Sequence, residues 1–334
     1  MWPFIKPIKL IRYLFVLRVN SSLVRLPRCL STELSLVLGA IIANRLPTRE
    51  ARPWRKALAP WDEHGGISLV GKKKPMTLPE ASWPIEAVLF VYPGKQTYGR
   101  EELILWELKL MGESADHGRF LEVILPALEE AGTVSDQQLQ CRNGLWGRFD
   151  IQAIYVARGP QWEPVVSDGR LDLNYRATPV QWAEGLTFEP KSERVFDRLT
   201  WIMPFDFSDA DQTGRRRRRK KIPSRQVPTL QSMLDSLVSR MSLLLPGKYN
   251  TPDDVWAILS AEEQATLRAA MEQASHIPIH YKGLEPAPKN CPGRWIGTQT
   301  FASIPHPIIP YLELASILHI GRQTHFGCGT FAIS

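Results

Sequence analysis

The basic run in the second half of the chain has the clearest chemical meaning. It lies between Gly214 and Pro223 and consists of Arg215, Arg216, Arg217, Arg218, Arg219, Lys220 and Lys221, with Arg225 soon after. Consecutive like charges repel one another and cannot pack, so we expect an exposed loop or one edge of a helical finger. Arginine forks match phosphate oxygens, and an A-form stem presents two phosphate rows across its narrow major groove. The run predicts RNA binding, with a solvated linker or a localisation tag as the alternative.

A glycine-rich segment at residues 321–329 is the second candidate. Its three glycines, Gly321, Gly327 and Gly329, allow a backbone to approach a ligand closely. Backbone amides there could hold a phosphate, with Arg322 supplying charge. His325 in the same segment has the side chain suited to acid or base work near neutral pH. A plain tight turn is the alternative interpretation.

Composition narrows the class of protein. A chain of 334 residues with 44% hydrophobic content can bury a large core and favours two domains. The formal charge of +7 favours polyanionic partners. The apolar opening stretch is interrupted by cations, and the run 34–43 is about half the roughly 20 residues of a spanning helix, so we expect a cytoplasmic protein with no membrane partner. The sequence lacks P-loop, zinc-protease, nucleophile-elbow and dinucleotide-binding motifs, and its cysteines form no CxxC pair.

The elements of the first half follow the order βαββαβ. Alternation predicts a strand over 8–19, and helical spacing predicts a helix through 34–42 that ends at Leu46-Pro47. Residues 47–84 show no clear period. A hairpin over 85–111, a helix over 120–131 and a strand over 149–156 complete the order. This order is typical of the ferredoxin-like unit, whose open sheet face often binds RNA.

The second half gives a second, elaborated unit of the same kind. We expect a short strand at 186–189, an amphipathic helix over 230–244, and a helical pair ending near Ser275 whose second member starts with a capping box. Strands at 277–281 and 294–304, a helix over 309–318 and a terminal strand follow. The prediction is therefore an α+β protein with ferredoxin-like domains at 1–160 and 161–334. The second domain carries a basic helical insertion at about 208–275.

The closing segment 318–329, with Gly321, Gly327 and Gly329, resembles the final motif of the CRISPR repeat-processing endoribonucleases. This family belongs to the RAMP superfamily of ferredoxin-like RNA-binding proteins. Looser matches are Tyr13-Leu14-Phe15 running into Leu26-Pro27-Arg28, and Gly147-Arg148-Phe149 at the end of the first unit. Residues 47–84 and 214–275 find no counterpart. The arginine-bearing helical insertion suggests the type IV branch.

The resemblance implies cleavage of precursor CRISPR RNA within each repeat, without a metal or other cofactor. The nucleophile is the 2′-hydroxyl beside the scissile phosphate, and the product keeps a 2′,3′-cyclic phosphate. The enzyme then stays on the hairpin of the mature CRISPR RNA (crRNA) as an effector-complex subunit, where a backbone subunit is an expected neighbour.

The catalytic candidates come from the position of the family's active site between the first strand and helix. Many members place a histidine in or near that helix, whereas the first histidine here is His64. We therefore expect Arg25 and Arg28 to orient the nucleophile and neutralise the phosphate together with Arg322, and His325 to act as acid or base. Ordinary surface charge is the alternative for the arginines.

Two other functions remain open. One is a non-catalytic subunit that only binds the hairpin, which the missing early histidine favours. The other is a generic basic protein that binds nucleic acid through counterion release without preference for a hairpin.

Overall fold

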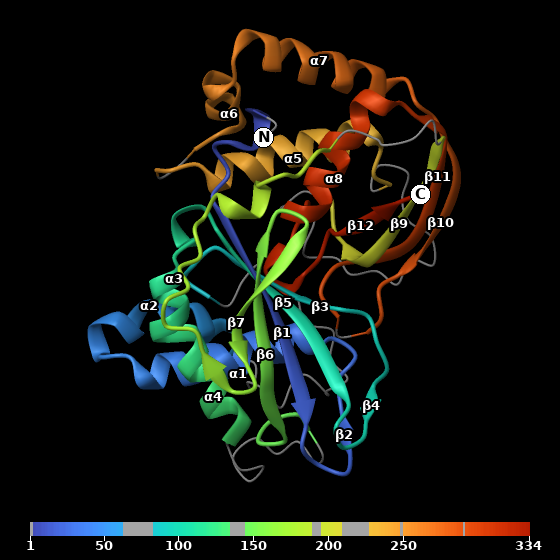
Figure 1. Cartoon of the computed structure of the whole chain (residues 1–334). Coiled ribbons are helices and arrows are strands. Elements are labelled where there is room, and N and C mark those ends of the chain that lie inside the picture. Colours follow the sequence, from blue (N-terminus) through green and yellow to red (C-terminus); the bar gives the residue numbers. More distant parts are fainter. Residues whose placement is uncertain are drawn as a thin grey trace. The chain divides into compact units, whose positions relative to one another are not determined.

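The computed structural model describes residues 3–62, 83–133, 144–188, 195–208, 227–247, 250–289 and 291–334. The chain forms two compact units, which differ in sequence content from the expected domains (Figure 1). The N-terminal unit is Lys9–Gly185, and the C-terminal unit combines Met1–Ile8 with Leu186–Ser334. The boundary follows residue 185 rather than residue 160 because two further strands extend the first sheet. The opening residues join the C-terminal unit because Phe4 packs edge-on against Tyr311, with ring centroids 5.1 Å apart.

The N-terminal unit has the predicted βαββαβ order. Its elements are β1 (Leu10–Val19), α1 (Leu30–Arg45), β3 (Ala87–Val91), β5 (Leu103–Met111), α4 (Leu125–Thr133) and β6 (Phe149–Arg158). A helix α2 (Thr48–Asp62) follows α1, and α3 (His117–Arg119) with a π-helical turn (Phe120–Ile124) precedes α4. The antiparallel sheet has the order β3-β5-β1-β6 and is extended by β7 (Gln161–Ser167) and β8 (Arg170–Leu171).

Every second side chain of β1 points into the core of this unit. Tyr13, Phe15 and Leu17 are fully buried, and Phe15 stacks on Trp106 with ring centroids 4.0 Å apart. On the opposite face of the sheet Arg12 and Glu107 form an ion pair of 2.6 Å between Nε and Oε1. The strand was predicted with at least one wet face. On the face that carries Arg12, the structure places this ion pair, in which the Glu107 side chain is 2% exposed.

Helix α2 occupies a stretch in which the sequence shows no clear period. Ala51, Trp54 and Leu58 are its buried residues, at the spacing of one helical face. Pro53 and Pro60 lie inside the helix and obscure its pattern. The exposed charged residues of this amphipathic helix include Arg49, Glu50, Arg52, Arg55 and Lys56. The contact with α1 therefore selects the helix over local breaking signals.

The C-terminal unit is a second ferredoxin-like unit. Its elements are β9 (Phe196–Phe205), α5 (Leu230–Leu244), α6 (Pro252–Ile258), α7 (Ala261–Ser275), β10 (Ile279–Pro286), β11 (Trp295–Ile304), α8 (Ile309–Leu318) and β12 (Phe331–Ile333). The sheet order β10-β11-β9-β12 is that of a βαββαβ unit in which α6 and α7 are inserted. The capping box predicted at Ser260 is confirmed, since its hydroxyl accepts from the Glu263 amide and Glu263 binds the Ser260 amide.

The first strand of this unit differs from the expected one. Residues 186–188 are not in a strand, and β9 begins at Phe196 instead. Leu199 and Trp201 are buried on alternate positions of β9, so the strand follows the usual period of two. In the part of the chain that the structure describes, none of the helices is both long and apolar enough to cross a bilayer.

Candidate functional site

The segment between β1 and α1 holds the first pair of predicted catalytic residues. Arg25 lies in β2 (Val24–Arg25), which pairs with β4 (Thr97–Tyr98), and its side chain is exposed. Arg28 is also exposed, immediately before the start of α1. Both guanidinium groups can therefore reach a phosphate in solution.

The first turn of α1 is unusually polar for buried structure. Ser31, Thr32 and Glu33 are each less than 5% exposed. Trp146 donates to Glu33, with 2.6 Å between Nε1 and Oε1. Burial raises the pKa of Glu33, and the hydrogen bond from Trp146 only partly opposes this. The sequence alone gave no reason to select this carboxyl, since its burial depends on the packing around Trp146.

The glycine-rich segment follows α8 in the C-terminal unit. Most of its backbone donors bond within the protein: Gly321 N–H to Ser236 Oγ (3.0 Å), Arg322 N–H to the Asp206 carbonyl (2.9 Å) and Gly329 N–H to the Pro204 carbonyl (3.1 Å). Phe326 and Gly327 donate to carbonyls inside the segment itself. These five amides are therefore occupied and cannot hold a phosphate in this conformation. RNA contact by the backbone of Gly321, Gly327 and Gly329 stays a prediction, and it requires these amides to exchange their partners when RNA binds.

The glycines are required by the packing of this segment. Gly321, Gly327 and Gly329 have φ of +87°, +82° and +82°, where side-chain-bearing residues are strained. A Cβ on Gly321 would lie 2.7 Å from the Asp206 carbonyl oxygen, and one on Gly329 would overlap the Ile320 carbonyl. The glycines thus let the loop lie against the end of β9.

His325 and Arg322 differ in access to solvent. His325 is 3% exposed, and its ring meets Phe326 edge-on with centroids 5.0 Å apart. Arg322 is half-buried. Of the two, Arg322 has the larger fraction of its surface open to solvent.

A second histidine, two residues before the glycine-rich segment, contacts the loop from its buried side. His319 is fully buried, and its Nδ1 lies 3.0 Å from the Gly327 carbonyl and 3.1 Å from the Cys328 carbonyl. Two carbonyl oxygens can only accept, so Nδ1 carries the proton. The residue stands inside the motif, yet the sequence does not distinguish its role from that of His325.

His117 is a buried histidine in the N-terminal unit. The Tyr13 hydroxyl lies 2.8 Å from its Nδ1, and its ring meets that of Tyr175 edge-on. Burial lowers the pKa of His117, and the backbone of Tyr175 only partly offsets this. The imidazole is therefore neutral near pH 7 and helps to pack α3 on β1.

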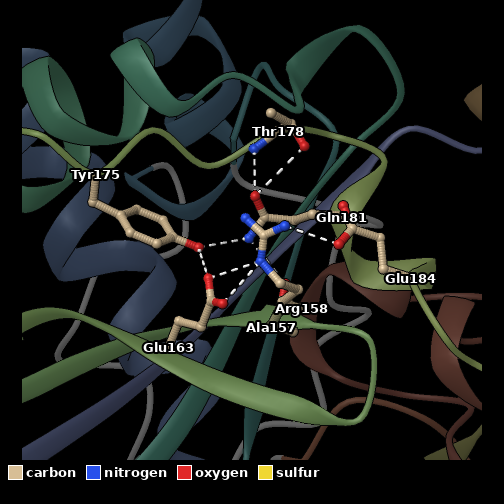
Figure 2. Close-up of polar contacts among 7 residues, drawn as sticks. All are labelled: Ala157, Arg158, Glu163, Tyr175, Thr178, Gln181 and Glu184. Atoms are coloured by element: carbon tan, nitrogen blue, oxygen red, sulfur yellow. Dashed lines mark hydrogen bonds and ion pairs between the residues drawn. The ribbon is translucent and has the colours of Figure 1, made fainter.

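A polar network in the same unit joins the β6–β7 hairpin to residues 175–184 (Figure 2). Arg158 lies between Glu163 (Nε to carboxylate, 2.9 Å) and Glu184 (Nη1 to Oε2, 2.8 Å). The Tyr175 hydroxyl donates to Glu163 (2.6 Å) and accepts from Gln181 Nε2 (2.8 Å). The hydrogen bonds from Tyr175 and Arg158 lower the pKa of Glu163. Because the Glu163 and Glu184 carboxylates both accept hydrogen bonds within the network, they hold residues 175–184 on the β6–β7 hairpin. We therefore do not assign a general base to this network.

The sequence-predicted residues fall into three groups. Arg25 and Arg28 belong to the N-terminal unit, whereas Arg322, His325 and the three glycines belong to the C-terminal unit. The basic run 215–221 and Arg225 lie outside the described residues.

Comparison with known protein families finds a match in the C-terminal part of the chain. The family model described as CRISPR-associated endoribonuclease Cas6 matches residues 199–331, from β9 to β12. This segment, less than half of the chain, is similar to the Cas6 family. The match includes the glycine-rich loop and the α6–α7 insertion, for which the sequence resemblance alone found no counterpart. No curated protein matches the sequence.

Solved structures similar to this chain carry Cas6 in their descriptions. A partial Cas6-RT-Cas1–Cas2 complex has a TM-score of 0.50 at 13% identity, covering 98% of this chain and 46% of the other. The Cas6-RT-Cas1–Cas2 complex has the same TM-score and identity, covering 98% and 29%. A Cas6 product complex has a TM-score of 0.46 at 14% identity, covering 98% and 99%. The chain thus spans less than half the length of the first two. At these identities the likeness concerns the fold.

Proposed function

We propose that this chain is an endoribonuclease that cuts precursor CRISPR RNA within its repeats. The match of residues 199–331 to the Cas6 family carries this proposal. The matched part includes a complete ferredoxin-like unit whose loop after α8 is shaped by three positive-φ glycines. The same Cas6-type fold over both units supports it.

The proposed reaction is attack of a 2′-hydroxyl on the adjacent phosphate, which leaves a 2′,3′-cyclic phosphate and a 5′-hydroxyl. It requires a group that accepts or orients the hydroxyl proton and cations that stabilise the phosphorane-like transition state. Neither task requires a metal ion or another cofactor. Arg25, Arg28 and Arg322 are proposed as the cations, because each side chain has access to solvent.

His325 completes the proposed set as acid or base. Its ring is buried against Phe326, so this role requires the loop to open when RNA binds. Arg322 is more exposed than His325, and this difference sets the order in which the two residues should be substituted. Arg322 is the first residue of this loop to substitute, and His325 the second.

The proposed substrate contacts outside the reaction centre are the basic run 215–221 and Arg225, which would follow the phosphates of the repeat stem. The enzyme would then stay on the 3′ hairpin of the crRNA, as a cytoplasmic effector-complex subunit beside a backbone subunit. Membership of the type IV branch is part of this proposal.

A second candidate function is a hairpin-binding subunit without catalysis. Two observations favour it: α1 contains no histidine, and the histidine of the glycine loop is buried. This subunit would bind the repeat tightly and leave it intact.

The deciding experiment incubates the protein in EDTA with end-labelled repeat RNA and with the same RNA carrying a 2′-deoxy substitution at the mapped cut. A single cut that the deoxy substitution abolishes is the expected result. Arg25→Ala, Arg28→Ala, Arg322→Ala and His325→Ala then separate the catalytic groups. Tight binding with no cut in either RNA would instead establish the hairpin-binding subunit.

Replacing residues 215–221 by glycine and serine is expected to weaken repeat binding and to flatten its salt dependence. Each lost phosphate contact should reduce the log-log slope of affinity against salt by roughly 0.7 to 0.9. Filter binding between about 50 and 300 mM salt measures the slope. The matched control is replacement of Arg49, Arg52 and Arg55 on α2 by Ser. An unchanged slope in the 215–221 variant would exclude the run from the RNA contact.

A further inference from the structure

The sheet of the C-terminal unit has one face covered by its helices and one open face. Leu199, Trp201, Gln299 and Phe301 point to the covered face and are at most 2% exposed. Figure 1 shows α5 and α8 on that side of β9 and β12. Arg198 and Thr200 on β9, and Thr298 and Thr300 on β11, lie at alternate positions that point to the other face, where they are half-buried or exposed.

Strand register places three different chemical groups in one row across this open face. Arg198 on β9 pairs with Thr300 on β11, and Thr300 pairs with Tyr281 on β10. Neighbouring strands are about 4.8 Å apart, so the row spans about 10 Å from the arginine backbone to the tyrosine backbone. A cation, a hydroxyl and an aromatic ring thus lie in line.

The next row is made of small and hydroxyl-bearing residues. Thr200 pairs with Thr298, and Thr298 pairs with Gly283. The hydroxyl oxygens of the two threonines are 3.2 Å apart. Neither row contains an acidic side chain, and Arg198 makes no ion pair with any residue in the described ranges. Besides the Tyr281 ring, the two rows therefore carry one cation, hydroxyl groups and a glycine.

Tyr281 is the exposed ring of this face. Tyr281 is 61% exposed. A Cβ added to Gly283 would lie 2.5 Å from Tyr281 Cε1 and 3.1 Å from the Tyr281 hydroxyl oxygen. One face of the ring therefore packs against Gly283, where the absence of a side chain leaves room for it. Its other side is left to solvent, which is the arrangement needed for stacking on a planar partner.

We propose that this open face binds an unpaired segment of RNA, with a base stacked on Tyr281, a phosphate on Arg198, and ribose or base-edge groups on the threonine hydroxyls. A single strand fits because stacking on the ring needs a free base face, which a duplex does not present. A protein partner fits less well, since Tyr281 is the single large apolar group in the two rows. The inference rests on RNA being the substrate, as proposed above, and adds a subsite for the single-stranded part of the same molecule.

The test compares Tyr281→Ala with Tyr281→Phe in fluorescence anisotropy on three probes: an unstructured ten-nucleotide RNA, its DNA counterpart, and a repeat stem-loop without flanks. Loss of one stacked base predicts about a tenfold weaker affinity of Tyr281→Ala for the single-stranded RNA, and near-native affinity of Tyr281→Phe. The stem-loop should bind all three proteins alike. Thr200→Val combined with Thr298→Val should reduce the preference for RNA over DNA.

Two results would overturn the proposal: equal affinity of wild type and Tyr281→Ala for the single strand, or equal losses for the alanine and phenylalanine variants. Since no cleavage is measured, a protein that fails to cut repeats still reports on this face. Conversely, a protein that cuts repeats normally can still fail this test. Leu243→Ala, at an exposed position of α5, is the control for a surface substitution that removes apolar area.

Discussion

Gly329→Ala is expected to lower the free energy of unfolding by more than about 3 kcal/mol and to abolish the proposed cleavage of repeat RNA. The added Cβ would overlap the carbonyl of Ile320, and the backbone at φ +82° disfavours any side chain. The overlap is with backbone, so no rotamer change relieves it. The loop would have to leave the end of β9, and the Gly329 amide would lose the Pro204 carbonyl.

Gly169→Ala is the matched control for this variant. Gly169 has φ +72°, but a Cβ there meets nothing within 4 Å. The substitution keeps the backbone strain and removes the overlap, so a cost of about 1 to 2 kcal/mol is expected. Urea unfolding of both variants measures the difference. Equal destabilisation would show that the glycine loop is held by its backbone angles alone and not by its contact with Ile320.

Glu107→Gln is expected to destabilise the protein by about 3 kcal/mol at pH 7. Arg12 and Lys109 are direct partners across β1 and β5, and the Glu107 carboxylate binds the Arg12 guanidinium at 2.6 Å. Glu107 is 2% exposed and Lys109 is 4% exposed. Removing the carboxylate leaves two neighbouring cations in a poorly hydrated place. Arg12→Met combined with Glu107→Met should regain part of the loss, because Lys109 is then the one remaining cation of the two that has lost the Glu107 carboxylate.

The pH dependence gives this prediction a second readout. Burial by itself would raise the pKa of Glu107, but the charges of Arg12 and Lys109 and the hydrogen bonds from Arg12 and Tyr92 outweigh it and lower the pKa. A lowered pKa stabilises the fold above the ordinary value of 4.5, and this contribution is lost as pH falls through the folded-state pKa. The gap between wild type and Glu107→Gln should therefore be constant from pH 7 to about 5 and shrink below 4.5.

The control pair for Glu107 is exposed. Arg45 and Glu130 form an ion pair of 2.9 Å at about 40% exposure or more. Glu130→Gln should cost well under 1 kcal/mol, since water screens the pair. A cost for Glu107→Gln no larger than that of Glu130→Gln would contradict the role given to burial.

The glycine loop shows how a motif can have two roles. Gly321 and Gly329 are needed for close backbone contacts, and most of the loop's amides are used in those contacts. The motif therefore encodes the shape of the loop first. The chemistry proposed for it belongs to Arg322, which that shape leaves partly open to solvent, and to His325, which it encloses.

The sequence by itself determined the order of elements in both units. Alternation and helical spacing are local, so they predicted β1, α1, α5, α8 and the capping box at Ser260, and the βαββαβ order led to the ferredoxin-like fold. The same local signals were weaker where prolines interrupt a pattern, which is why α2 was missed. They also placed the first strand of the second unit too early.

Only the tertiary structure decided which polar residues are buried and which are open. Glu33, His117 and His319 look in the sequence like any surface residue, but packing around Trp146, Tyr13 and the glycine loop encloses them. His325 was predicted to be available for catalysis and is enclosed against Phe326. Strand register, which aligns Arg198, Thr300 and Tyr281, is likewise a property of pairing between distant segments. Burial and register depend on contacts far apart in the chain, and a local pattern contains no record of them.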